Sequence, residues 1–102
     1  MKVYDKLVRD RIPKVIEESG KKCEVEIVSN EVALEYLYKK LSEEVEELLT
    51  DKNIYEIADV MEVLFAIAGK YGYSENEVLE VRNVKKSARG GFEDNIVLKK
   101  VK

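Results

Sequence analysis

Apolar side chains return every three or four residues along two long stretches of the chain. The first stretch can be capped by Ser29 or Asn30 and runs to about Leu49, and the second runs from Ile54 to about Tyr71. Only a short polar sequence separates the two stretches, which favours a tight connection between antiparallel neighbours. The pattern therefore predicts two long helices packed side by side.

Shorter signals predict one helix on each side of this pair. Pro13 suits the first turn of a short helix over residues 13–19, and the glycine that follows can end it. The sequence Ser-Glu-Asn-Glu at 74–77 fits a capping box that starts a further helix. The glycine pair at 90–91 is expected to stop that helix.

Two further segments predict strands. Residues 23–28 alternate apolar and charged side chains, with the odd-numbered positions on the apolar face. Residues 92–101 are expected to return as a second strand beside them. The expected fold is mainly α: an antiparallel helical bundle with a small accessory two-stranded β element, in a single domain over residues 1–102.

The residue composition excludes several kinds of active site. The chain has 102 residues, no histidine and a single cysteine, Cys23. Without histidine it cannot form a Ser-His-Asp or Cys-His arrangement or an HExxH zinc site, and one cysteine cannot form a zinc cluster. Any chemistry must therefore come from Glu, Asp, Lys, Arg and Tyr.

The charge and the length bear on the expected partners. The formal net charge is −3, and lysines and arginines are spread from end to end, which does not favour binding to a nucleic-acid polymer. Small anionic ligands remain open. A chain of this length builds only a modest core, so we expect it to associate with further copies as a homodimer or homotetramer.

Several features of the sequence bear on its compartment. The charged start, MKVYDKLVRDR, lacks the apolar stretch of a signal peptide, and the longest apolar run, residues 63–68, is too short to cross a bilayer. A single cysteine excludes a disulfide within the chain and suits a reducing compartment. We therefore expect a cytoplasmic protein without a membrane partner.

Helical projection divides the glutamates of the first long helix into two pairs. At about 100° per residue, the apolar side chains of this helix gather in one sector of about 120°. Glu44 and Glu47 lie on the flank of that sector, whereas Glu43 and Glu46 project to roughly the opposite side. The apolar sector consists of Leu34, Leu37, Leu41, Val45, Leu48 and Leu49.

The second long helix is apolar around most of its circumference and is expected to be largely buried. Asp59 and Glu62 share a narrow stripe, with Glu56 about 60° to one side. Buried carboxylates are normally paired, protonated or bound to a metal, and Mg²⁺ prefers oxygen ligands. The spacing is typical of a divalent-metal site; the alternative is ordinary ion pairing with Lys39 and Lys40.

These acids also carry a resemblance to a known family. Glu44-x-x-Glu47 followed by Glu56-x-x-Asp59 resembles the metal-binding signature of the all-α nucleoside triphosphate pyrophosphohydrolases, the MazG-like superfamily that includes phosphoribosyl-ATP pyrophosphohydrolase. The opening YDKLVRDRIP at 4–13 and the RGGF at 89–92 resemble a small house-cleaning branch whose members begin with a KLVRDKIP-like motif. The similarity extends over nearly the whole chain, although the two motifs are closer together than in members with long interhelical loops.

The resemblance implies the all-α pyrophosphohydrolase fold and hydrolysis of a nucleoside triphosphate between its α- and β-phosphates, giving the monophosphate and pyrophosphate. It implies Mg²⁺, with Mn²⁺ as an alternative ion, bound by Glu44, Glu47 and Asp59. Glu62 is then a further ligand or an outer-shell acceptor. Glu44, Glu47 or Glu56 would accept the proton of the attacking water.

A triphosphate also needs cations to bind its phosphates. The late basic residues are similar to the family's phosphate-binding segment, and the opening motif offers a second basic set. The alternative for the late lysines is a solvated helix surface. The late set is Arg82, Lys85, Lys86 and Arg89, and the early set is Lys6, Arg9 and Arg11.

Two other functions are compatible with the sequence. The same acids could hydrolyse phosphoribosyl-ATP instead of a common nucleoside triphosphate. Alternatively, the chain could be a non-catalytic helical module that binds a nucleotide or a partner protein, with the acids forming surface ion pairs. The preferred base and sugar of a nucleotide substrate stay open at this stage.

Overall fold

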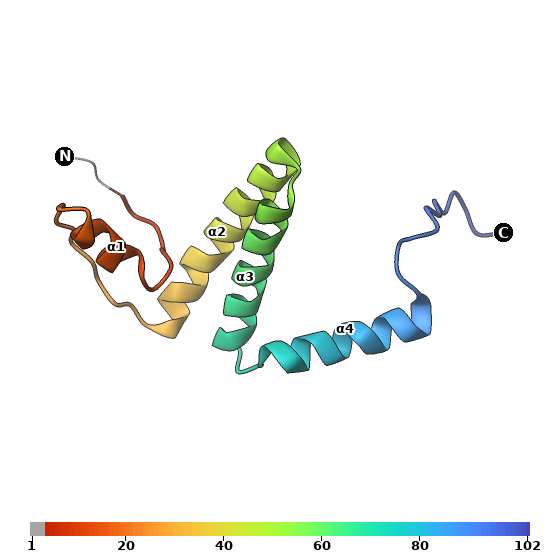
Figure 1. Cartoon of the computed structure of the whole chain (residues 1–102). Helices are drawn as coiled ribbons and strands as arrows, with labels where there is room; N and C mark the ends of the chain where they lie inside the picture. The colour runs from red at the N-terminus through yellow and green to blue at the C-terminus, as the bar shows by residue number, and fades with distance from the viewer. Residues whose placement is uncertain (1–3) are drawn as a thin grey trace.

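The computed structural model describes residues 4–102, so the first three residues of the predicted domain lie outside the described part. Four helices follow one another along the chain (Figure 1): α1 (Ile12–Glu18), α2 (Asn30–Asp51), α3 (Ile54–Lys70) and α4 (Glu75–Arg89). The prediction of a mainly helical chain is therefore confirmed.

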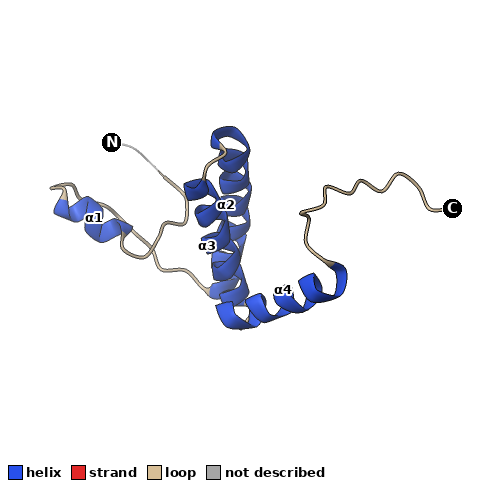
Figure 2. Cartoon of the chain, turned by 45° about the vertical axis from the view of Figure 1, so that its right-hand side comes forward, coloured by secondary structure: helices blue, strands red, loops and turns tan. Residues whose placement is uncertain are grey.

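The central unit is a hairpin of α2 and α3, which run antiparallel and side by side (Figures 1 and 2). Ser29 caps α2, because its side chain accepts a hydrogen bond from the amide of Val32 at 3.3 Å. Lys52 then adopts the left-handed conformation with φ of 54°, which reverses the chain. Asn53 caps α3 at once by accepting the amide of Glu56 at 3.1 Å.

Three side chains form the buried core of the hairpin: Ala33, Leu37 and Val63. At its far end the Lys70 ammonium donates to the side-chain oxygen of Asn30 at 3.3 Å. The prediction that α3 is largely buried is wrong for the single chain, because only α2 packs along its length. An apolar stripe on α3 stays open to solvent and contains Ile57, Met61 and Leu64, each 46–49% exposed.

Helix α4 leaves the hairpin and projects away from it (Figure 1). The capping box at its start is confirmed: the Ser74 hydroxyl accepts the amide of Glu77 at 3.1 Å, and the Glu77 carboxylate accepts the amide of Ser74 at 3.0 Å. Gly90, with φ of +83°, ends the helix. Antiparallel helix packing in the described chain is thus confined to α2 and α3.

The predicted two-stranded β element is not seen in residues 4–102. Segments 23–28 and 92–101 lie on opposite sides of the hairpin (Figures 1 and 2), in a molecule 62 Å long. A strand needs a neighbour for its backbone N–H and C=O groups. Neither segment has one among residues 4–102, so the sequence pattern alone does not produce strands here.

The molecule is extended for its length. Its Cα radius of gyration is 17.9 Å, whereas a compact domain of about 100 residues has a value of about 13 Å. The projecting α4 and the segment after it account for much of the difference (Figure 2). No helix within residues 4–102 has both the length and the apolar character needed to cross a membrane.

Candidate metal centre

Three carboxylates meet between α2 and α3. Glu44 comes from α2, and Glu56 and Asp59 come from successive turns of α3. One oxygen from each carboxylate lies within 4.8 Å of the corresponding oxygens of the other two. The reversal of the chain at Lys52 and Asn53 is what places the first turns of α3 opposite the last turns of α2. The arrangement offers three oxygen donors to a single cation.

Two of these carboxylates, Glu44 and Glu56, are partly buried. The Glu44 side chain is only 13% exposed, and its Oε2 atom and the Oε2 atom of Glu56 are buried without a hydrogen-bond partner among the described residues. A buried carboxylate oxygen without a partner is costly. A cation bound among the three carboxylates would offset this cost, so the donor set fits a divalent metal.

The surroundings of Glu44 and Glu56 favour the protonated forms of these two acids. Burial, followed by a hydrogen bond and charge repulsion from Glu47, raises the pKa of Glu44, although Lys40 opposes the shift from 3.8 Å. Burial, followed by the charges of Glu47 and Asp51, raises the pKa of Glu56. Among the described residues, Glu44, Glu47, Glu56 and Asp59 thus outnumber the cations paired with them, which are Lys40 and Arg9.

The N-terminal segment supplies one of those cations. The Arg9 guanidinium Nη2 lies 2.9 Å from Oδ1 of Asp59, although the two residues are far apart in the sequence. Asp5, earlier in the same segment, accepts a hydrogen bond from the hydroxyl of Tyr36 on α2 at 2.6 Å. This hydrogen bond and the charge of the Asp5 carboxylate raise the pKa of Tyr36. These two contacts hold the segment against both helices of the hairpin.

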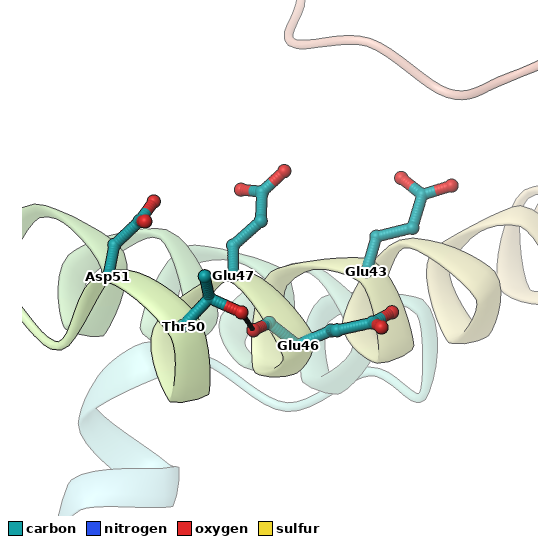
Figure 3. Close-up of a pocket in the computed structure, with 5 residues that line it drawn as sticks. All are labelled: Glu43, Glu46, Glu47, Thr50 and Asp51. Carbon is teal, nitrogen blue, oxygen red and sulfur yellow. Dashed lines mark hydrogen bonds between the residues drawn. The ribbon is translucent and has the colours of Figure 1, made fainter.

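Glu47 lies beside the three carboxylates and is exposed to solvent. It lines an open hollow with Glu43, Glu46, Thr50 and Asp51 (Figure 3). In Figure 3, Glu43, Glu47 and Asp51 point to the same side of α2. The prediction that Glu43 projects opposite to Glu47 is therefore wrong, because residues four apart lie one above the other on a helix.

The structure regroups the predicted metal ligands. Glu44 and Asp59 lie together as the sequence suggested, but the third member is Glu56, which helical projection had set to one side. Glu62 is exposed, and neither Glu62 nor Glu47 belongs to the group whose oxygens lie within 4.8 Å. Within the described residues, Glu56 thus joins Glu44 and Asp59 in this group, and the metal roles predicted for Glu47 and Glu62 stay predictions.

The basic residues predicted to bind phosphate fall into two regions. The late set of Arg82, Lys85, Lys86 and Arg89 is exposed on α4, which starts at the far end of α3 from the three carboxylates (Figure 1). There the Lys86 ammonium pairs with Glu93 at 3.9 Å. A single chain therefore does not bring these cations to the acids.

Three lysines lie around a small cavity between the N-terminal segment and α2, and one of them, Lys40, is 3.8 Å from Glu44. Lys6, Lys39 and Lys40 line this cavity together with Tyr36. The Lys39 ammonium lies 5.5 Å from the centre of the Tyr36 ring. The sequence predicts Lys39 and Lys40 as ion-pair partners of the acids. Lys40 lies one helical turn before Glu44, and this spacing is the sequence feature that indicates its position at the site.

No protein-family model matches the chain, and no curated protein or solved structure matches it. The resemblance to MazG-like enzymes that the motifs suggest therefore stays a prediction. Three of the four acids in those motifs, Glu44, Glu56 and Asp59, are the ones that converge. Such a site can bind a divalent cation and, through it, a ligand that carries negative charge.

The raised pKa of Glu44 predicts how stability depends on pH. Because this pKa lies above its ordinary 4.5, the folded chain retains a proton that the unfolded chain releases, and stability falls as pH rises from 4.5 through the raised pKa. Glutamine cannot ionise. In metal-free buffer, Glu44→Gln should therefore raise the melting temperature by a few degrees at about pH 7 and leave it unchanged at about pH 4, measured by circular dichroism.

The matched control is Glu43→Gln, which makes the same change at an exposed neighbour. It should leave the melting temperature within about one degree of the unmodified chain at both pH values. If Glu43→Gln and Glu44→Gln changed the melting temperature equally at both pH values, the raised pKa of Glu44 would be contradicted.

Proposed function

We propose that the chain is a MazG-like nucleoside triphosphate pyrophosphohydrolase that depends on Mg²⁺, with Mn²⁺ as the alternative ion. It would cleave between the α- and β-phosphates and release a nucleoside monophosphate and pyrophosphate. The observation that carries this proposal is the meeting of Glu44, Glu56 and Asp59, with two buried oxygens that have no partner. The order of the ExxE and ExxD motifs supports the same reaction.

Glu44, Glu56 and Asp59 would hold the metal in this proposal. A bound Mg²⁺ neutralises phosphate charge and orients the leaving pyrophosphate. The half-buried position of the three acids keeps their oxygens fixed and partly shielded from water. Arg9, which lies 2.9 Å from Asp59, would stand beside the ion and could donate to a phosphate bound there.

Glu47 is the residue best placed to accept a proton from the attacking water. The carboxylates of Glu44 and Glu56 each have a buried oxygen, whereas Glu47 faces the open hollow where water has access (Figure 3). A general base must lie within hydrogen-bonding reach of the water that it activates. Glu62, one turn beyond Asp59, is assigned an outer-shell role.

The triphosphate would lie along the early cations. Lys6, Lys39 and Lys40 line one cavity together with Asp5 and Glu43, and Lys40 connects this cavity to Glu44 at 3.8 Å. The three lysine charges could oppose those of the phosphates. The late cations on α4 would reach a site only in another copy of the chain. The open stripe of Ile57, Met61 and Leu64 supports association into a homodimer or homotetramer.

A non-catalytic binding module is the second candidate, and the same open stripe favours it. A partner protein could cover these apolar side chains without any reaction at the acids. The two functions differ in a direct way: only the enzyme converts a nucleotide. Activity measurements on the intact chain therefore separate them.

Asp59→Asn should lower pyrophosphate release by at least about 100-fold, because outer-shell changes at metal sites already cost about 10–100-fold. The assay incubates the chain with Mg²⁺ and a panel of common and modified nucleoside triphosphates and phosphoribosyl-ATP, and it measures pyrophosphate and orthophosphate separately. Removal of the metal with EDTA should abolish the activity of the unmodified chain.

Asp94→Asn is the control, since Asp94 is an exposed acid beyond α4, and it should retain full activity. Circular dichroism checks that Asp59→Asn keeps its helices. Full activity in Asp59→Asn would exclude the proposed metal centre, and failure of the unmodified chain to convert any of the nucleotides would favour the binding module.

A comparison of two lysines tests which cations bind the phosphates. Lys39→Ala should raise KM by about 10-fold or more, because a hydrogen bond to a charged group contributes about 1.5–3 kcal/mol, and kcat should change less. Lys85→Ala, the same change on α4, should leave KM within about twofold of the unmodified enzyme. A larger effect at Lys85 would show that α4 supplies the phosphate site.

A further inference from the structure

Two apolar segments of the chain have no structural partner. Residues 23–28 and 96–101 are extended, and no backbone hydrogen bond within the described part of the chain involves them. Their apolar side chains are among the most exposed in the molecule. These are Val25, Ile27, Ile96, Val97, Leu98 and Val101, which are 62–97% exposed.

This combination is unfavourable for a segment that remains alone. Exposed β-branched side chains and unpaired backbone groups are the features through which one strand recruits another. Residues 23–28 also alternate apolar and charged positions, as a half-exposed strand does. Both segments therefore have the character of strands that lack a neighbour.

The two segments cannot meet within one chain in this structure. The hairpin of α2 and α3 stands between them (Figures 1 and 2), and the molecule is 62 Å long. After α4 the chain turns at Gly90 and again at Asn95, which has φ of 57°, before it continues as an arm over residues 96–101. The arm points away from residues 23–28 of its own chain.

A second copy of the chain could bring the two segments together. A two-fold axis that runs beside the hairpin, perpendicular to the long direction of the molecule, would set the two copies next to each other with their sides exchanged (Figure 1). The arm of each copy would then face residues 23–28 of the other, and both pairings would form at once. Such an arrangement is closed, so it stops at two chains.

The charges of the two segments fit an antiparallel register. When Glu26 lies opposite Lys100, Glu24 lies opposite Lys102, and two opposite-charge pairs form on one face. The same register also pairs apolar residues: Val25 with Val101, and Val28 with Leu98. Ile27 then lies opposite Lys99, whose methylene stem can cover it.

We propose that residues 98–102 form an antiparallel strand with residues 24–28 of a second copy of the same chain. The result is a two-fold dimer that exchanges its C-terminal arms and contains two small intermolecular sheets. The proposal is independent of the chemistry at the carboxylates. It explains why both segments have the pattern of strands yet remain unpaired in the single chain.

Disulfide trapping between two differently labelled chains tests the pairing. In a Cys23→Ser background, one chain carries Val25→Cys and an affinity tag, and an untagged chain carries Val101→Cys. After the chains are mixed, refolded and oxidised, a disulfide that joins tagged to untagged chains should form in high yield on a non-reducing gel. A contact within one chain cannot produce this species.

The control replaces Val101→Cys with Val81→Cys, a valine on α4 with similar exposure to Val25, which should give little mixed disulfide. Equal yields with both partners would overturn the proposal. So would the absence of mixed disulfide when circular dichroism shows intact helices. A disulfide that forms only when both cysteines are in one chain would show that the arm folds back on its own chain.

Charge reversal provides a second test that uses no cysteine chemistry. Glu26→Lys alone, or Lys100→Glu alone, places two like charges opposite each other in each of the two intermolecular sheets. Each single variant should therefore raise the dimer Kd about threefold or more, measured by analytical ultracentrifugation. The double variant restores opposite charges and should recover the original Kd. The proposal would be overturned if the double variant raised the dimer Kd by the product of the two single effects. It would also be overturned if the unmodified chain were monomeric at every concentration.

Discussion

The antiparallel packing of α2 against α3 is the constraint on which the candidate site depends. The left-handed conformation of Lys52 and the immediate cap at Asn53 leave little freedom in how the two helices align. This alignment fixes which acids face each other. Glu44 meets Glu56 and Asp59 because the reversal occurs where it does, and a residue inserted between the helices would change the pairing.

The close approach of three carboxylates has an electrostatic cost that the hairpin itself does not remove. Burial and mutual repulsion raise the pKa of Glu44 and of Glu56. Cations within the described chain offset part of this cost, with Lys40 beside Glu44 and Arg9 beside Asp59. The buried oxygens that remain without partners are the strongest physical reason to assign a divalent ion to the site.

Local features of the sequence predicted local features of the structure well. Ser29 and the capping box at Ser74 mark helix starts because capping involves neighbouring residues only. The predicted strands failed because a strand depends on a distant partner, and the chain does not bring segments 23–28 and 92–101 together. Periodicity also overestimated the burial of α3, since it shows which side chains are apolar and not what covers them.

The site was only partly accessible to sequence reasoning. Helical projection singled out Glu44 and Asp59, and it favoured Glu62 over Glu56. A projection gives the direction of each side chain around its own helix, but it does not show how two helices are aligned along their length. Glu56 entered through the motif resemblance alone. No sequence pattern indicated the contact between Arg9 and Asp59, which joins the N-terminal segment to α3.

Binding of Mn²⁺ to the metal-free chain, followed by electron paramagnetic resonance, tests most directly whether the three converging carboxylates form one metal centre. The unmodified chain should bind one ion per chain, and Glu56→Gln should weaken binding by about 10–100-fold. Glu62→Gln should leave the affinity unchanged. Absence of Mn²⁺ binding, or a loss at Glu62 in place of Glu56, would contradict the metal centre assigned to Glu44, Glu56 and Asp59.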